Sequence, residues 1–454
     1  MRYLSELLDS QDDHRHLQIE SAISAVLNPS IVQDLLDILP EQKAAIKRQW
    51  NLESIIEMQN KKLQKLICEA YYNSPYYHEM FVKLNIHPES AKTIDDLQRL
   101  PSLTSDTLRE YQSSILAADV MEESGLKAYL SQSSGTSGYA KTVFHLENDL
   151  VVKAAVQYRQ FHSWFDDEKV ITWIDQEKDS TFLAYHTGWH CYQSYTPGEV
   201  AQYPKLLSAT DVLIGHPYFL KYIARSFQSQ KIYLDIDAVI TTYDFLDVET
   251  RACLKKAFGS NIYEFITMSE LSVPTAWECE THRGLHVNND YVIVEILNVD
   301  CDQPVPIGSV GEIAVTDLHN SLMPLIRYRT GDLAAWILEP CLCGRPMPLI
   351  TSLLGRLSSS IRTNDGFFLL QDLFEITAPL GIGDVELIYS SSENTAILEI
   401  GNHVRHMIVD IEDYILPLEM ILGCKVQIVF VDAVETTSTG KFRSIITKEE
   451  NERR

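Results

Sequence analysis

A segment of small and hydroxylated residues between positions 133 and 142 could bind a phosphate group. It reads Ser133-Ser134-Gly135-Thr136-Ser137-Gly138-Tyr139-Ala140-Lys141-Thr142. Small residues let the backbone approach an anion closely, hydroxyl and backbone N–H groups can donate to its oxygens, and Lys141 adds a positive charge. The same residue types favour an ordinary polar hairpin turn, so this segment alone leaves both interpretations open.

The P-loop of nucleotide triphosphatases is a second functional interpretation of this segment. Gly135 and Lys141-Thr142 almost fit its spacing, but Ala140 stands where the second glycine belongs. A P-loop must also open directly into a helix. Residues 142–146 (Thr-Val-Phe-His-Leu) instead predict a strand, and the helical pattern begins only after the acidic residues that follow. We therefore expect a phosphate-binding loop within a β-hairpin.

Two further motifs lie toward the C-terminus. The first is Tyr328-Arg329-Thr330-Gly331-Asp332, in which a carboxylate beside a glycine is suited to accept hydrogen bonds from two ribose hydroxyls. The second is Ser438-Thr439-Gly440-Lys441-Phe442-Arg443, a basic turn. Alone, each would be an unremarkable turn, but the three motifs in this order are much more specific than any one of them.

Together the motifs resemble those of the adenylate-forming superfamily, which includes acyl-CoA synthetases, luciferases and the adenylation domains of peptide synthetases. The resemblance is closest to the phenylacetate-CoA ligase branch. It extends from about Leu52 to Arg443 and leaves the first fifty residues unexplained. The further segments that carry it are Asn73 to Tyr77, Pro101 to Leu108, Glu278 to Glu295 and Cys341 to Arg345.

The resemblance implies ATP-dependent activation of a carboxylic acid to an acyl-adenylate, followed by transfer of the acyl group to coenzyme A. An aromatic acid is the expected substrate. The alternative is an adenylating enzyme that delivers the acyl group to a carrier protein, to an amine or to a reductase partner. A different class of function, a degenerate nucleotide-binding protein with a regulatory role, would not require Lys441, Glu270 and Asp332 together.

The resemblance also implies roles for individual residues. Lys441 would reach the carboxylate and the α-phosphate, and Glu270 would bind Mg²⁺. Both charges are needed because the reaction brings two anions together. Asp332, assisted by Arg356, would hold the ribose of ATP. The other expected nucleotide contacts are Ser133, Ser134, Gly135, Thr136, Ser137, Gly138, Lys141, Tyr243, Asp244 and Ser269.

Several positions depart from the pattern of this family. Thr241-Thr242-Tyr243-Asp244 replaces a Gly-Glu near the adenine, and Ile266-Thr267 replaces a Tyr-Gly. Ser358-Ser359 replaces the acidic pair at which the C-terminal lid of the family rotates. We therefore expect lid rotation to be altered, which affects the second half-reaction more than the first.

The cysteines and histidines of the central region could form a metal site. Cys341 and Cys343 flank one residue, and Cys279 lies upstream with His282 and His286 close behind. Two thiolates in a tight turn and a distant Cys/His pair suit tetrahedral zinc, although unligated reduced thiols fit the spacing equally well. The resemblance favours a structural zinc held by Cys279, His286, Cys341 and Cys343, and it favours His286 because that residue lies in a matching Gly-Leu-His.

The acid pocket is expected between the α/β core and the β-rich region. Aromatic side chains there would suit a flat aryl acid, but core packing explains aromatic residues just as often. The candidate lining residues are Tyr185, His186, Trp189, His190, His216, Pro217 and Tyr218.

These residues must be positioned by an α/β protein of several parts. Residues 1–50 predict a helical N-terminal extension, and residues 51–355 predict a large domain with a parallel α/β core and a β-rich subdomain. Residues 356–454 predict a small α+β lid domain. Lys441 lies 300 residues beyond Lys141, so this lid must be mobile and must fold back over the site.

The composition limits the partners that the protein can have. Its formal net charge is -25 over 454 residues, and such an acidic surface repels nucleic acid and anionic membranes. We find no apolar run that could cross a bilayer and no secretion signal, so a cytoplasmic location is expected. The expected partner is a small-molecule carboxylate, with a carrier protein as the alternative acceptor, and a homodimer is compatible with the sequence.

Overall fold

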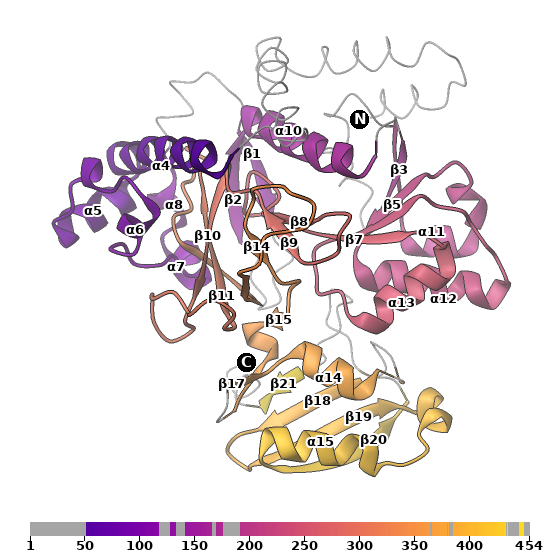
Figure 1. The fold of residues 1–454 in the computed structure, drawn as a ribbon. Coiled ribbons are helices and arrows are strands. Elements are labelled where there is room, and N and C mark those ends of the chain that lie inside the picture. The colour runs from indigo at the N-terminus through magenta and orange to yellow at the C-terminus, as the bar shows by residue number, and fades with distance from the viewer. Residues whose placement is uncertain are drawn as a thin grey trace.

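The computed structural model describes residues 51–117, 128–132, 141–165, 169–175, 191–363, 366–378, 380, 385–432, 434 and 445–448. The predicted N-terminal extension, residues 1–50, lies outside the described residues. Figure 1 shows a large upper part built around β-sheets and a smaller lower part that contains the C-terminal elements. The expected mixed α/β architecture is confirmed. Among the described residues, no helix combines the length and apolar character needed to cross a bilayer.

The described chain opens with a long helix that shorter helices follow. Asn51 caps α4 (Leu52–Asn73) by accepting from the backbone N–H of Ser54 at 2.8 Å. The helix ends before Pro75, which begins α5 (Pro75–Leu84), because proline favours the first turn of a helix. Then follow α6 (Ile94–Leu97), α7 (Ser105–Glu110) and α8 (Gln112–Ile115).

A nine-stranded sheet forms the centre of the large part. Its order is β13-β14-β9-β8-β7-β6-β5-β3-β4, and β4, β3, β5, β6 and β7 run parallel. These five strands are Cys191–Tyr195, Val170–Ile174, Val212–Gly215, Ala238–Thr241 and Asn261–Ile266. The parallel core that was predicted for residues 51–355 is therefore present.

Helices cover both faces of the parallel strands, which explains why β5 and β6 are buried along their whole length. On one face, α12 (Pro217–Gln230) and α13 (Val248–Phe258) bury Phe227 and Phe258. On the other face, Phe161 and Phe165 at the end of α10 (Glu147–Trp164) pack with Trp173 of β3. The described part of this region also contains α11 (Pro197–Gln202) and a short 3₁₀ helix (Pro204–Leu207).

The other end of the sheet is antiparallel and joins the predicted β-rich region. It contains β8 (Ala276–Glu278), β9 (Leu285–Val287), β13 (Trp336–Ile337) and β14 (Leu349–Ile350). A second sheet, in the order β10-β11-β12-β15, consists of Val292–Leu297, Gly311–Asp317, Tyr328–Ala334 and Gly355–Arg356. The predicted domain boundary after residue 355 falls inside β15.

The C-terminal elements form the lower part of Figure 1. A four-stranded sheet in the order β20-β19-β18-β21 carries α14 (Leu370–Thr377) and α15 (Glu412–Leu422). Its strands are Lys425–Val431, Thr395–Gly401, Val385–Ser390 and Ile445–Thr447. A hairpin of β16 (Ile361–Thr363) and β17 (Gly366–Phe368) precedes them.

Candidate active site

The candidate phosphate-binding loop ends at a hairpin, as its sequence predicts. Thr142–Leu146 is strand β2, which pairs in antiparallel fashion with β1 (Ala128–Gln132), and α10 begins only at Glu147. The P-loop arrangement, in which a helix follows the loop directly, is therefore absent here. Ser133, Ser134, Gly135, Thr136, Ser137 and Gly138 lie outside the described residues.

Lys141, at the start of this hairpin strand, meets two residues from distant parts of the chain. Its Nζ atom lies 2.5 Å from Oε1 of Glu270, in the turn after β7, and 2.8 Å from the hydroxyl of Tyr328, which opens β12. The Tyr328 hydroxyl in turn donates to Oε1 of Glu270 at 3.1 Å. The structure thus brings the predicted phosphate ligand and the predicted magnesium ligand into direct contact.

The Glu270 carboxylate is buried and ionised. Burial alone would raise its pKa, but the charge and hydrogen bond of Lys141 outweigh burial and hold the pKa below its usual value. The other oxygen, Oε2, accepts from the hydroxyl of Ser269 at 3.2 Å. Two carboxylate oxygens and a nearby hydroxyl form an oxygen-rich donor set, which is the kind that Mg²⁺ prefers.

The predicted ribose ligands form a second pair beside this cluster. Asp332 and Arg356 lie opposite each other on β12 and β15, with 3.1 Å between Nε and Oδ1. Burial raises the pKa of Asp332, and Arg356 opposes that effect. The charges of Asp244, Glu270 and Lys141 also influence Asp332, so the predicted phosphate and ribose ligands belong to one electrostatic unit.

Asp244 and Tyr243 follow β6, where the parallel strands end. Oδ2 of Asp244 lies 3.3 Å from Nε2 of His216, the residue between β5 and α12. Tyr243 has a φ of 74°, a left-handed backbone that bulky residues rarely adopt. Its ring lies 6.2 Å from that of Trp173. Strained backbone of this kind is often found at functional sites.

The candidate zinc ligands come from the end of β8, from β9 and from the turn around residues 341–343. Ligand atoms of Cys279, His286, Cys341 and Cys343 all lie within 4.8 Å of one another, and all four residues are buried. Sγ of Cys343 is 3.2 Å from Nε2 of His286, and Sγ of Cys279 is 3.5 Å from Sγ of Cys341. Three thiols and one imidazole suit the tetrahedral coordination of zinc.

The surroundings of His286 also suit a metal ligand. Its Nδ1 atom is 3.1 Å from the carbonyl oxygen of Met347, which leaves Nε2 directed at the thiols. His282, the alternative histidine, lies apart from the cluster. It is more exposed, and its Nδ1 pairs with Glu278 at 3.1 Å.

Comparisons with known proteins show which enzymes the chain is similar to. No protein-family model matches the chain. The chain is 25% identical over 325 residues to phenylacetate-coenzyme A ligase of Thermus thermophilus, covering 67% of this chain and 71% of that one. The corresponding Pseudomonas putida enzyme is 25% identical over 324 residues, with the same coverage.

The fold agrees with this sequence similarity. A crystal structure of 2-hydroxyisobutyryl-CoA ligase in the postadenylation state, in complex with 2-HIB-AMP, superposes with a TM-score of 0.73 at 17% identity, covering 89% of this chain and 92% of that one. The chain is therefore similar to adenylate-forming ligases in both sequence and fold. Its sequence similarity is to phenylacetate-coenzyme A ligases, the branch that the motifs indicated.

The structure describes only some of the predicted substrate residues. Among the predicted lining residues, His216 lies beside Asp244, and Pro217 and Tyr218 begin α12. Tyr185, His186, Trp189 and His190 lie outside the described residues, as does Lys441.

Two residues near the candidate site were not predicted from the sequence. One contacts the turn that carries Ser269 and Glu270, and the other contacts Lys141. The side chain of His145 is buried, and its Nε2 atom lies 3.4 Å from the carbonyl oxygen of Ser269. Burial lowers its pKa to about 3, so the ring is neutral. Ser105 approaches Lys141, with 3.4 Å between Oγ and Nζ. The neighbouring Thr104, and not Ser105, caps the helix α7 that begins here.

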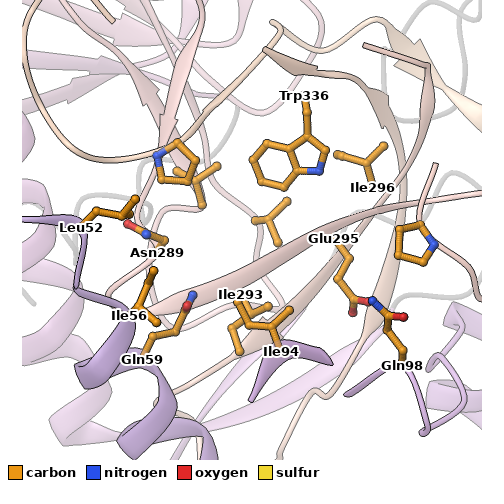
Figure 2. Close-up of a pocket in the computed structure, with 14 residues that line it drawn as sticks. Leu52, Ile56, Gln59, Ile94, Gln98, Asn289, Ile293, Glu295, Ile296 and Trp336 are labelled. Carbon is orange, nitrogen blue, oxygen red and sulfur yellow. The ribbon is translucent and has the colours of Figure 1, made fainter. Parts of the chain in front are cut away.

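A pocket of about 330 Å³ lies among residues of α4, α6 and the β-rich region. Figure 2 shows Leu52 and Ile56 of α4, Ile94 of α6 and Trp336 of β13 around it. Its lining is mostly apolar, and no predicted site residue takes part. The pocket is therefore separate from the candidate nucleotide site.

Proposed function

We propose that this protein is an AMP-forming acid–thiol ligase that makes an acyl-adenylate from ATP and a carboxylic acid, and then an acyl-CoA. The observation that carries the proposal is the meeting of Lys141, Glu270, Asp332 and Arg356 in one electrostatic unit. The fold and the sequence similarity to phenylacetate-coenzyme A ligases agree with it.

Each group has a distinct part in the first half-reaction. Glu270 would bind Mg²⁺, which supplies charge neutralisation on the phosphates. Lys141 would donate to phosphate oxygens, and Asp332 would accept from the ribose hydroxyls. The substrate carboxylate is already ionised at neutral pH, so no general base is needed. Its oxygen attacks the α-phosphorus, and the bond to pyrophosphate breaks.

In the second half-reaction, the thiolate of coenzyme A attacks the acyl carbon and AMP leaves. Lys441 would act in the first step only, which requires the C-terminal part to change its position between steps. A carrier protein is the second candidate acceptor. It is favoured by one observation, the absence of a carboxylate in the short 3₁₀ helix Leu357–Ser359, where the family has its hinge.

The substrate and the metal content follow from the same reasoning. His216, Tyr218 and the strained Tyr243 lie near the ends of parallel strands, where ligands bind in α/β folds. An aryl acid would suit their rings.

The cluster of Cys279, His286, Cys341 and Cys343 would hold one structural zinc. Its reduced thiols suit the cytoplasm.

The function is tested with a panel of aryl and alkyl carboxylates in an ATP–pyrophosphate exchange assay. At least one acid should stimulate exchange in the presence of Mg²⁺. Coenzyme A should then convert that acid to an acyl-CoA seen by mass spectrometry. Binding of ATP without exchange for any acid would instead indicate the regulatory, degenerate alternative.

A further inference from the structure

The hydroxyl groups of Tyr328 and Ser105 surround the contact between Lys141 and Glu270. Tyr328 lies 2.8 Å from Lys141 Nζ and 3.1 Å from Glu270 Oε1, and it is 3.2 Å from the hydroxyl of Ser105. Tyr328 is 1% exposed and its ring packs in the main core. A buried hydroxyl with three polar neighbours is held in one place.

The direction of each hydrogen bond follows from counting hydrogens. A tyrosine hydroxyl has one hydrogen, and Tyr328 donates it to Glu270, an ionised carboxylate that can only accept. Tyr328 must therefore accept from both Lys141 and Ser105. The Ser105 hydroxyl donates to Tyr328 and offers a lone pair to Lys141. A tyrosine hydroxyl ordinarily keeps its hydrogen at neutral pH.

Backbone pairing between two distant segments positions Ser105 beside Tyr328. Leu103 forms an isolated parallel bridge with Tyr328. Its N–H donates to the carbonyl of Arg327 at 3.0 Å, and its carbonyl accepts from the N–H of Arg329 at 2.9 Å. Two residues later α7 begins at Ser105, capped by the Thr104 side chain. The spacing between the two hydroxyls is thus set by main-chain hydrogen bonds.

We propose that Tyr328 and Ser105 are positioning residues that hold Lys141 beside Glu270 while leaving the carboxylate accessible to Mg²⁺. This inference rests on the proposed function. A lysine with Glu270 as its main acceptor would compete with the cation for the same oxygens. The two neutral hydroxyls give the ammonium other acceptors, so Lys141 stays oriented when Mg²⁺ takes the carboxylate.

The test is ATP binding, measured by titration calorimetry over a series of Mg²⁺ concentrations, which needs no knowledge of the acid. Tyr328→Phe keeps the ring and removes the hydroxyl. We expect the Mg²⁺ concentration for half-maximal ATP affinity to rise about tenfold, the usual effect of losing one hydrogen bond to a charged group. Ser105→Ala should shift it in the same direction by less.

Tyr77→Phe is the matched control. Tyr77 is equally buried, and its hydroxyl bonds to the backbone of Pro324 and Ile326, away from Lys141. This variant should melt at a lower temperature with an unchanged Mg²⁺ dependence. The same Mg²⁺ dependence in Tyr328→Phe as in the wild type would overturn the inference. Failure of the wild type to bind ATP with Mg²⁺ would instead overturn the proposed function.

Discussion

The Nε atom of Arg356 lies 3.1 Å from Oδ1 of Asp332, and the two residues are directly opposed across β12 and β15. The pair joins the predicted ribose ligand to the first residue of the predicted C-terminal domain. Burial raises the pKa of Asp332, and Arg356 is the largest influence that opposes it. Arg356 therefore helps to keep a buried acceptor carboxylate ionised.

Arg356→Met should raise the KM for ATP because it changes the pKa of the predicted ribose ligand Asp332. Without the guanidinium, the pKa of Asp332 rises further, so the carboxyl takes up a proton at a higher pH than in the wild type. We expect the KM for ATP to increase about tenfold at pH 7.5 and to increase more as the pH falls to 6. Arg356→Lys, which retains the charge, should keep the pH dependence of the wild type. A KM in the methionine variant that is equal to wild type at every pH would contradict this role.

Lys441→Ala should reduce acid-dependent ATP–pyrophosphate exchange by roughly a hundredfold or more, because one charge stabiliser of the transition state is lost. ATP binding itself should change little, since Lys441 is expected to act on the carboxylate and α-phosphate during the reaction. Arg443→Ala, in the same basic turn, is the control. Equal exchange rates in Lys441→Ala and the wild type would remove Lys441 from the mechanism.

The purified protein should carry about one zinc per chain, as a closed site of four ligands requires. Elemental analysis after purification without chelators measures the metal. Cys341→Ser with Cys343→Ser should abolish zinc binding and lower the melting temperature, while Cys301→Ser, at an exposed free cysteine, should do neither. Zinc-free protein with unchanged stability in the double variant would rule out a structural metal.

Coenzyme A should accelerate AMP formation over many turnovers if it is the acceptor. Ser358-Ser359 lacks the carboxylate that stabilises one lid position in the family, so the second half-reaction is expected to be slow. Ser359→Asp should then increase steady-state turnover and leave pyrophosphate exchange unchanged. A single burst of adenylate that neither coenzyme A nor Ser359→Asp affects would favour a carrier protein or another dedicated acceptor.

Lys153 should make stability depend on alkaline pH. Burial lowers its pKa to about 8 from an ordinary 10.5. Below pH 8 the buried side chain is charged, which costs stability. Between about pH 8 and 10.5 the unfolded chain binds more protons than the folded one, so this cost decreases as the pH rises. Lys153→Met should therefore melt higher than the wild type at pH 7, and the difference should shrink by pH 10. A pH-independent difference in melting temperature would argue against a shifted pKa.

Local sequence patterns predicted much of the fold and the gathering of the cysteine cluster. The alternation in residues 142–146 identified β2, and the Gly-Leu-His context selected His286 over His282, which the structure places apart from the thiols. These features could be predicted because each depends on residues that are close in the sequence or on the motif spacing of the family that the chain resembles. The roles of the predicted site residues remain predictions.

The contacts of Ser105 and the backbone of Tyr243 could not be predicted in the same way. Ser105 reaches Lys141 because Leu103 pairs with Tyr328. No local sequence pattern predicts a pairing between residues that lie so far apart in the sequence. Tyr243 adopts a left-handed φ where glycine would be usual. Tertiary packing against Trp173 therefore overrides the local preference of the backbone.

The bridge between Leu103 and Tyr328 also sets when the site can form during synthesis. At about 5–20 residues per second, a ribosome needs roughly 10–45 s to travel from one position to the other. Throughout that interval Leu103 has no partner strand, and Ser105 has no tyrosine beside it. Nascent chains that stop before β12 should therefore be unable to hold ATP, and they should present an unpaired segment to chaperones.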